Sequence, residues 1–263
     1  MAIDGPLQGK NILVTGASSG LGRALVKEGA RRGNQVFAAA RSMDKLRNLA
    51  HEVGESGGQG RLTPIEADVR DPASIQNLFA LIDQMVLKVD VVINNAAVGH
   101  NSSIGEITDE EATQIVSTNL LGTIMITREA IKRMIPHGSG QIAFISSLAG
   151  KLAFPNLAVY SATKFGVEGF AEAAREELGA TGIGVTLIRP GIMDTNFFKT
   201  AGMGDFARNM KNKMQTPEDV ARQALEAIER NKSEITIGSD KRFLPFLKHF
   251  PRSIARKLLP YIT

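Results

Sequence analysis

The sequence predicts an α/β domain built on a doubly wound parallel sheet of seven strands flanked by helices. Short apolar runs alternate with longer amphipathic runs from one end of the chain to the other. Most of the short runs are rich in Val and Ile and are apolar on both faces, as strands buried inside a parallel sheet are. At 263 residues the chain is long enough for one large domain and short for two. We therefore expect a single domain.

Seven apolar runs are the expected strands, and six amphipathic runs are the expected helices. The strands are Asn11–Thr15, Gln35–Ala40, Arg61–Glu66, Val89–Asn94, Gln141–Ser146, Gly184–Arg189 and Glu234–Ile237. The helices are Leu21–Arg32, Met43–Glu55, Pro72–Lys88, Asp109–Met134, Ser161–Ala180 and Pro217–Arg230. Asp71 and Thr216 each precede a proline, a pattern typical of helix starts. Thr108 and Glu111 have the spacing of a capping box.

Two segments depart from the alternation. Residues 192–215 are rich in Met, Phe, Lys and Gly, and we expect them to form a substrate lid because long connections in compact domains are often binding loops. Residues 241–263 are a basic, aromatic C-terminal extension beyond the main domain, which spans 1–240. The extension is predicted to cover the pocket or a neighbouring subunit, and weak contact with a membrane surface is the alternative.

The composition argues against several classes of protein. The chain has no cysteine, and its four histidines lack ligand spacing, so we expect no metal site. There are only two tyrosines, no tryptophan and no basic stripe across the main body, so we expect no nucleic-acid partner. The N-terminus lacks the basic flank and apolar run of a signal peptide, and no apolar stretch is long enough to span a bilayer. These features favour a cytoplasmic protein.

A glycine-rich turn follows the first expected strand. It has the sequence Thr15-Gly16-Ala17-Ser18-Ser19-Gly20-Leu21-Gly22, and a helix comes next. Glycines let the backbone turn sharply and approach a phosphate, and the helix N-terminus supplies free N–H donors. The glycine spacing differs from the common dinucleotide fingerprint, and a tight strand–helix junction is the structural alternative. The position after the first strand favours a cofactor-phosphate site.

The second expected strand ends at Ala40, and Arg41 follows it. An acidic residue at this point would bind the adenosine ribose of NAD. A guanidinium suits the 2′-phosphate of NADP instead. An ordinary surface arginine is the alternative, and we favour NADP(H) as the cofactor.

Tyr160 and Lys164 are four residues apart on one expected helix and therefore share a face. A phenol titrates near ~10 in water, which is too high for an efficient base at neutral pH. A nearby ammonium, helped by a positive nicotinamide ring, is expected to favour the phenolate. The pair taken alone could also be explained by a structural contact between the two side chains on the helix. Two further features favour catalysis, because Ser146-Ser147 end a buried strand and Asn119 lies in an otherwise apolar stretch.

Six motifs, in this order and spacing, resemble those of the short-chain dehydrogenase/reductase family, in its shorter single-domain branch. They are TGASSGLG, NNAA, STN, ISS, YSATK and RPG. The resemblance covers about residues 8–238. It implies a Rossmann-type fold and an NADP-dependent oxidoreductase that interconverts a carbonyl and a secondary alcohol by hydride transfer. It also implies a homodimer or homotetramer packed through the helices at Asp109–Met134 and Ser161–Ala180. One departure is Ala97, where the family often has glycine.

The resemblance implies a role for each matching residue. Tyr160 would be the general acid/base, and Ser147 would hydrogen-bond the substrate oxygen. Lys164 would hold the nicotinamide ribose and lower the pKa of the tyrosine, and Asn119 would anchor a water that links Lys164 to solvent. The expected cofactor contacts are Gly16, Ser18, Ser19, Gly20, Leu21, Gly22, Arg41, Asp68, Val69, Asn95, Tyr160, Lys164, Pro190, Gly191, Ile192 and Thr195.

The substrate pocket should be lined by segments that follow the strands. The expected lining residues are Val98, His100, Leu148, Ala149, Phe154, Leu157, Ile192, Phe197, Phe198 and Met203. They are mostly apolar and include no arginine to clamp a carboxylate or phosphate, so we expect an apolar ketone, aldehyde or secondary alcohol, steroid- or lipid-like. A sugar-nucleotide epimerase would need a larger C-terminal region. A nonenzymatic NADP-binding sensor or scaffold protein is the alternative from another class, and it would be expected to have lost a catalytic residue.

Overall fold

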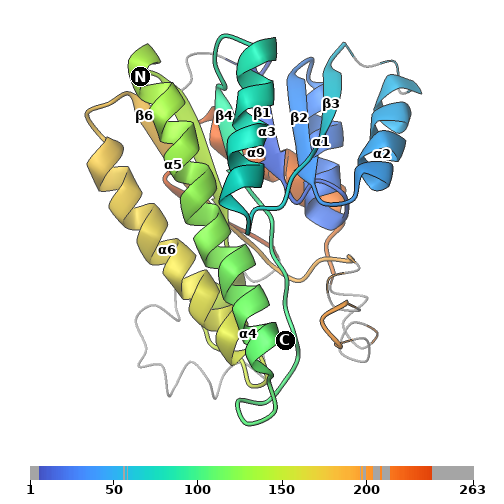
Figure 1. The fold of residues 1–263 in the computed structure, drawn as a ribbon, viewed down its shortest axis with the longest axis vertical. Helices are drawn as coiled ribbons and strands as arrows, with labels where there is room; N and C mark the ends of the chain where they lie inside the picture. The colour runs from blue at the N-terminus through green and yellow to red at the C-terminus, as the bar shows by residue number, and fades with distance from the viewer. Residues whose placement is uncertain are drawn as a thin grey trace.

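A parallel sheet forms the centre of the protein (Figure 1). The computed structural model describes residues 6–238 apart from 56, 58, 196, 198–199, 204–207 and 209–213. Within this part of the chain, seven parallel strands pair in the order β3-β2-β1-β4-β5-β6-β7. They are β1 (Asn11–Thr15), β2 (Gln35–Ala40), β3 (Arg61–Glu66), β4 (Val91–Asn94), β5 (Gly140–Ile145), β6 (Ile183–Pro190) and β7 (Glu234–Ile237). The predicted doubly wound parallel sheet is confirmed.

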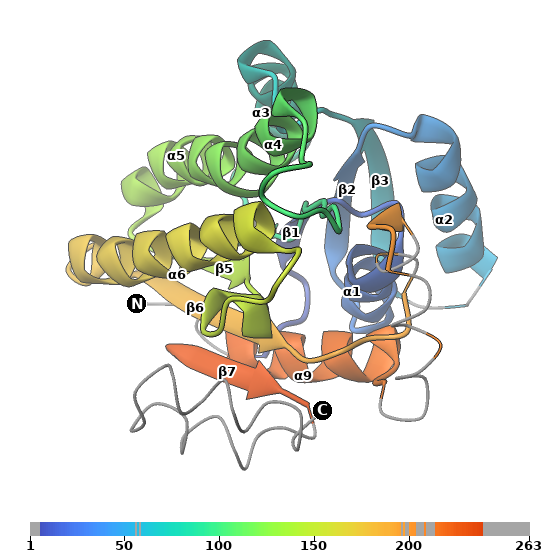
Figure 2. The ribbon, with the colours of Figure 1, turned by 90° about the horizontal axis from the view of Figure 1, so that it is seen from below.

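Helices cover both faces of the sheet (Figure 2). They are α1 (Gly20–Arg31), α2 (Met43–Glu55), α3 (Pro72–Met85), α4 (Asp109–Val116), α5 (Gly122–Met134), α6 (Ala158–Leu178) and α9 (Pro217–Glu229). Helices α1, α2 and α9 share one hydrophobic core with the sheet, and α3, α5 and α6 share the other. The chain runs outward from β1 to β3 and then returns to β4 beside β1. Because nearly all parallel crossovers are right-handed, this reversal moves α3, α5 and α6 to the second face. Helix α9, between β6 and β7, is the exception and lies on the first face.

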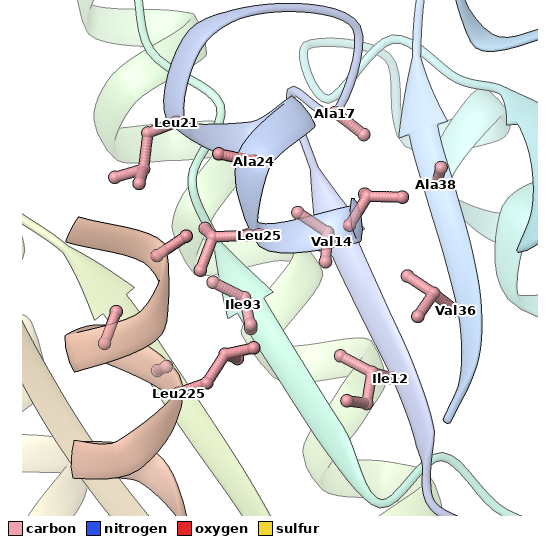
Figure 3. Close-up of a cluster of buried hydrophobic side chains, with 14 of the residues drawn as sticks. Ile12, Val14, Ala17, Leu21, Ala24, Leu25, Val36, Ala38, Ile93 and Leu225 are labelled. Atoms are coloured by element: carbon pink, nitrogen blue, oxygen red, sulfur yellow. The ribbon is translucent and has the colours of Figure 1, made fainter. Parts of the chain in front are cut away.

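Alternate residues of the central strands enter the two cores. In β1, Ile12 and Val14 belong to the core shared with α1 and α9, whereas Leu13 belongs to the core on the other face. Figure 3 shows the first of these cores, where Leu25 of α1 and Leu225 of α9 lie close to the strands. Successive side chains of a strand point to opposite faces, so a strand covered on both sides is apolar at most positions. This explains the continuous apolar runs of the sequence.

The predicted helix caps are present. The Asp71 and Thr216 side chains accept hydrogen bonds of 2.9 and 3.2 Å from backbone N–H groups in the first turns of α3 and α9. Thr108 and Glu111 exchange hydrogen bonds of 3.2 and 3.1 Å in a capping box at the start of α4. These side chains satisfy N–H groups that have no partner inside the helix, and so they fix where the helices begin.

The chain is helical over Asp109–Met134 as predicted, but residues Ser117–Leu121 form a π-helical turn between α4 and α5. Within this turn the buried Asn119 side chain accepts a hydrogen bond from Val98 N and donates one to Val98 O, both at 2.8 Å. These two bonds hold the wider turn against the segment after β4. Single π-helical turns inside α-helices occur frequently at functional sites.

Other boundaries differ by a few residues. Helix α3 ends at Met85 rather than Lys88, because Val86 adopts an extended conformation with φ −141° and ψ 150°. Strand β4 starts at Val91 rather than Val89. Helix α6 starts at Ala158 rather than Ser161 and thus includes Tyr160 in its first turn.

Some predictions lie outside the described residues. These are the extension at 241–263, the pocket residue Phe198 and several residues of the lid expected at 192–215. The division into a main domain at 1–240 and an extension therefore stays a prediction. In the part of the chain that the structure describes, no helix is both long enough and apolar enough to cross a membrane.

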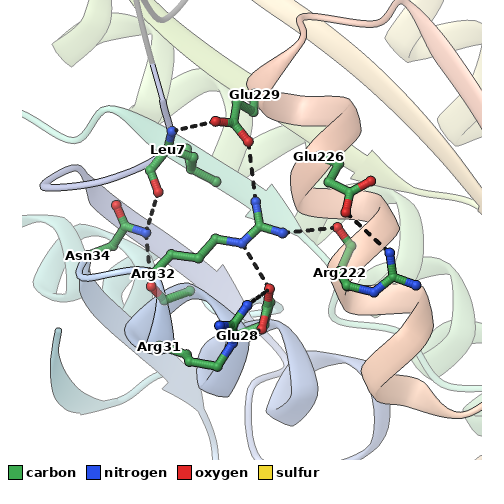
Figure 4. A network of polar contacts seen from close by, with 9 residues as sticks. Leu7, Glu28, Arg31, Arg32, Asn34, Arg222, Glu226 and Glu229 are labelled. Carbon is green, nitrogen blue, oxygen red and sulfur yellow. Dashed lines mark hydrogen bonds and ion pairs between the residues drawn. The ribbon is translucent and has the colours of Figure 1, made fainter. Parts of the chain in front are cut away.

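A polar network joins the two ends of the described chain (Figure 4). Arg32, directly after α1, donates to Glu28 at 2.9 Å, to Glu229 of α9 at 3.3 Å and to the backbone O of Arg222 at 3.3 Å. Glu229 also accepts a 3.2 Å hydrogen bond from the backbone N of Leu7. The first described segment, the first helix and the last helix are thereby held together.

Replacing Leu225 with alanine is expected to lower the free energy of unfolding by about 2–5 kcal/mol. Leu225 is fully buried, so the shorter side chain leaves a cavity in the core that α9 shares with α1. Denaturant unfolding followed by circular dichroism measures the change. The control is Leu81→Ala at a position of α3 that is 41% exposed, where we expect a change within ~0.5 kcal/mol. An equal loss of unfolding free energy at Leu225 and Leu81 would contradict the buried packing of Leu225.

Candidate active site

A cavity of about 1900 Å³ runs along the carboxyl ends of strands β1 to β6. The residue that directly follows each of these strands lines it. These residues are Gly16, Arg41, Ala67, Asn95, Ser146 and Gly191. The cavity crosses the point between β1 and β4 where the strand order reverses, and open α/β sheets bind their ligands at such a point.

The glycine turn after β1 forms one wall of this cavity. Gly16 and Gly20 have φ values of +65° and +51°, which favour glycine. A side chain at Gly22 would place its Cβ 2.2 Å from the carbonyl oxygen of Gly16. Ser19 precedes α1 without making a side-chain cap, and the first turn of α1 holds no acidic residue. The N–H groups at the start of α1 are therefore available to an anion.

Asn95 holds this turn in place. Its side-chain amide donates to the backbone O of Thr15 at 2.9 Å and of Gly16 at 3.3 Å. Its own backbone N–H donates to the Thr15 hydroxyl at 3.0 Å. Asn95 lines the cavity as predicted for a cofactor contact, but its amide nitrogen is occupied by the turn. Its hydrogen bonds thus fix the shape of the glycine turn, the wall of the cavity that is expected to bind the cofactor phosphates (the phosphate wall).

Charged residues gather at the end of the cavity next to β2 and β3. Asp68 is paired with Arg70, whose guanidinium beside it lowers the pKa of the carboxyl group. Arg41 is exposed and forms no hydrogen bond or contact ion pair within the described ranges. Its charge acts on Asp68 through space. Arg70 and Lys45 also line this end of the cavity. They were not predicted as cofactor contacts, although Lys45 follows Arg41 closely in the sequence.

Tyr160, Lys164 and Ser147 meet at the other end of the cavity. Burial raises the pKa of the Tyr160 phenol to about 12, and a hydrogen bond with Ser147 opposes this rise. Burial lowers the pKa of Lys164 to about 8, and the charge of Glu168 opposes this fall. The Lys164 ammonium donates to the backbone O of Ile145 at 2.8 Å and lies 5.7 Å from the centre of the Tyr160 ring. With a pKa of about 12 the phenol is protonated at neutral pH, and the lowering of this pKa by Lys164 and a nicotinamide ring stays a prediction.

Asn119 lies behind the wall of the cavity rather than in it. Besides its two bonds to Val98, its side chain donates to the Thr163 hydroxyl at 3.2 Å. Thr163 belongs to α6 and stands next to Lys164. The amide of Asn119 therefore ties the segment after β4 to the helix of Tyr160. A water anchored by Asn119 stays a prediction.

The expected apolar pocket surrounds Tyr160. The described lining residues include Val98, Leu148, Ala149, Phe154, Leu157, Ile192, Phe197 and Met203. Phe197, from the expected lid, packs on the Tyr160 ring with 5.5 Å between ring centres. Gly99 permits this contact, because a Cβ there would lie 2.8 Å from the Phe197 ring. Thr118, Leu152 and Ala153 also line the cavity and were not predicted.

His100, predicted to line the substrate pocket, contacts α4 instead. Its ring nitrogens lie 3.5 Å from the Glu111 carboxylate and 3.4 Å from the Gln114 side-chain oxygen. These contacts on α4 turn the imidazole away from the cavity, whose lining does not include it. Among the described residues, no group of three His, Cys, Asp or Glu side chains could hold a metal ion.

Comparisons with known proteins give consistent matches. The family model for short chain dehydrogenases matches residues 10–204. The ketoacyl reductase HetN of Nostoc sp. is 34% identical over 241 residues, which cover 89% of this chain and 80% of that protein. The dehydrogenase/reductase SDR family member 7B of Xenopus tropicalis is 29% identical over 258 residues, which cover 95% of this chain and 82% of that protein.

Solved structures share the fold over almost the whole chain. Actinorhodin polyketide ketoreductase, in a crystal structure with NADPH, matches with a TM-score of 0.79 and 29% identity, over 91% of this chain and 98% of that one. A short-chain dehydrogenase/reductase from Burkholderia phymatum, in complex with NAD, matches with a TM-score of 0.87 and 22% identity, over 97% of both chains. The second likeness concerns the fold alone.

Proposed function

The chain belongs to the short-chain dehydrogenase/reductase family of oxidoreductases, and on that premise we propose that it is an NADPH-dependent enzyme that interconverts a carbonyl compound and a secondary alcohol. One observation carries the proposal. A single cavity has an anion-accepting glycine turn and a free guanidinium at one end, and Tyr160, Ser147 and Lys164 at the other. A cofactor lying along the cavity would connect the two ends.

The residues present fit a dinucleotide phosphate. The first turn of α1 would receive the pyrophosphate, because its N–H groups are uncapped by side chains. Arg41, with Lys45 beside it, would hold the 2′-phosphate of NADP, since the position after β2 carries no carboxylate that would select NAD. Lys164 would hold the nicotinamide ribose, as the family resemblance implies. Actinorhodin polyketide ketoreductase, similar over most of its length, was crystallised with NADPH.

The protonated phenol suits the reduction of a carbonyl group. When bound, NADPH supplies a hydride to the carbonyl carbon. Tyr160 donates its phenolic proton to the carbonyl oxygen as negative charge develops there. The Ser147 hydroxyl accepts a 3.1 Å hydrogen bond from Ala149 N, which leaves its own hydrogen to donate to the same oxygen. The Lys164 ammonium stabilises the phenolate that results.

The lining of the catalytic end favours an apolar substrate. Apart from Lys164, the charged residues that line the described cavity lie after β2 or at and after the end of β3, at the expected adenosine end. Leu148, Phe154, Leu157 and Phe197 surround Tyr160 with apolar surface. We infer that the substrate is an apolar ketone or aldehyde, steroid- or lipid-like, or the corresponding alcohol.

We also infer a homodimer or homotetramer. Val116 at the end of α4 and Leu121 before α5 are 43% and 47% exposed. A second copy would cover this apolar surface together with the outer face of α6. Light scattering during gel filtration measures the mass. A monomer at micromolar concentration would contradict the inference.

A panel of carbonyl compounds and alcohols with NADPH and NADH tests the function. We expect turnover of apolar ketones or aldehydes, with NADPH preferred. Arg41→Ala should lower kcat/KM for NADPH by about 10- to 100-fold and leave NADH use almost unchanged, because a hydrogen bond to a charged group contributes about 1.5–3 kcal/mol. Arg31→Ala is the control, since Arg31 is exposed at the opposite end of α1 from the cavity. A preference for NADH, or turnover of small charged substrates alone, would contradict the proposal.

A further inference from the structure

Helix α6 presents a third polar residue in register with Tyr160 and Lys164. Glu168 follows Lys164 by four residues, as Lys164 follows Tyr160, so the three side chains form a stripe along one face. All three are buried. The family motif ends at Lys164, and the chemistry described above uses only the first two.

The stripe meets three consecutive residues at the end of β5. The Lys164 ammonium donates to the backbone O of Ile145 at 2.8 Å. The hydroxyl of Ser146 donates to Glu168 Oε1 at 2.9 Å. Ser147 forms a hydrogen bond with Tyr160. Each residue of the stripe therefore holds one residue of the segment that carries Ser147.

Glu168 also binds the segment that follows β5 and the end of β6. Arg189 donates to its two carboxylate oxygens at 2.7 and 3.1 Å, and the Lys151 ammonium lies 2.9 Å from Oε2. Arg189 directly precedes Pro190-Gly191, which line the cavity. A single buried carboxylate thus connects α6, the segment around Ser147 and the strand that leads to the expected nicotinamide site.

Cations predominate around Glu168. Three cations face it, namely Lys164 on its own helix, Lys151 after β5 and Arg189 on β6. The other nearby carboxylate is Glu234 of β7, which is 43% exposed and binds Arg189 at 2.9 Å. Loss of the Glu168 charge would leave buried cations with one partly solvated anion, and burial disfavours the charged form of the lysine.

We propose that Glu168 is a positioning residue for the reaction at Tyr160, which fixes Ser146 and hence Ser147 against α6 and keeps the Lys164 side chain charged. The inference rests on the proposed carbonyl chemistry. Glu168 is not among the residues that line the cavity and acts through Ser146 and Lys164. Because the glycine turn and Arg41 lie at the other end of the cavity, we expect Glu168 to affect kcat more than the KM for NADPH.

Three variants test this role. Glu168→Gln removes the charge but keeps an acceptor for Ser146 and Arg189. Glu168→Asp keeps the negative charge on a shorter side chain. Glu234→Gln is the control, because it removes the other carboxylate of Arg189 without touching α6. For each variant, kcat and KM are measured against pH, and the Lys164 ammonium is titrated by NMR with labelled lysine, its signal assigned with Lys164→Met.

We expect Glu168→Gln to lower kcat about 10- to 100-fold, since a displacement near 1 Å can have that effect, with the KM for NADPH within about twofold. Its Lys164 signal should titrate at lower pH than in wild type, because the neighbouring negative charge is gone. Glu168→Asp should show a Lys164 titration close to that of wild type, and its kcat should lie between those of Glu168→Gln and wild type. Glu234→Gln should leave both near wild type.

Two results would overturn the role. One is a Glu168→Gln enzyme with wild-type kcat and an unshifted Lys164 titration. The other is an equal loss in Glu234→Gln, which would indicate general destabilisation, and denaturant unfolding of all variants checks this directly. If the wild-type protein reduces no carbonyl compound, the proposed function fails. The Lys164 titration then still decides whether Glu168 keeps the lysine charged.

Discussion

Replacing Tyr160 with phenylalanine is expected to lower kcat for carbonyl reduction by about 10²- to 10⁴-fold, which is the usual contribution of a general acid. The substitution removes the proton donor and the hydrogen bond with Ser147, while the ring keeps its contact with Phe197. Because the cofactor turn lies at the other end of the cavity, the affinity for NADPH should change little. Steady-state rates and the fluorescence of bound NADPH measure the two quantities separately.

The same variant reports the ionisation of Tyr160. The chain has two tyrosines and no tryptophan, so the difference in absorbance near 295 nm between wild type and Tyr160→Phe isolates this phenol. Burial raises its pKa to about 12, so the transition should lie above that of free tyrosine, ~10. Alcohol oxidation needs the phenolate and should gain rate as pH rises, whereas carbonyl reduction needs the phenol. Wild-type activity in Tyr160→Phe, or a transition near neutral pH, would contradict the assignment.

Gly22→Ala is expected to disrupt the phosphate wall and to weaken NADPH binding by more than about tenfold. The added Cβ would lie 2.2 Å from Gly16 O and 2.5 Å from the Asn95 amide nitrogen. The first of these is backbone, so the turn itself must move. Such overpacking typically lowers the free energy of unfolding by about 1–3 kcal/mol. Isothermal titration with NADPH and denaturant unfolding measure the two effects.

Gly54→Ala is the matched control for this substitution. Gly54 also lies in a helix, α2, but a Cβ there meets no atom within 4 Å. Alanine in a helix is favoured over glycine by roughly 0.5–1 kcal/mol, so this variant should be slightly more stable than wild type and should bind NADPH normally. If Gly22→Ala also bound NADPH normally, the glycine turn would not be the phosphate site.

The fold could be predicted because its signals are local and repeated. A strand buried on both faces is mostly apolar, and the caps at Asp71, Thr108 and Thr216 fix where helices start. The residues of the cavity could be located for the same reason, since carboxyl ends of parallel strands meet at one edge of the sheet. Gly16 and Arg41 follow directly from that geometry, whereas the choice of Ser147 over Ser146 rests on the family resemblance.

Other features depend on contacts between distant segments, which periodicity does not encode. The π-helical turn at Ser117–Leu121 depends on bonds between Asn119 and Val98, 21 residues apart. His100 turns toward α4 because Glu111 offers a partner there. The pKa of Tyr160 depends on its burial, which its spacing from Lys164 cannot show.

The network around Arg32 has a consequence for synthesis of the chain. Helix α1 is synthesised well before α9, yet Leu25 shares its core with Leu225, and both Arg32 and the backbone N of Leu7 bind the carboxylate of Glu229. The nascent β1–α1 unit must therefore keep apolar surface exposed until α9 has been made. Contacts this distant in sequence slow folding and lengthen the period of exposure to aggregation. Truncation before α9 should thus yield a chain that needs chaperones.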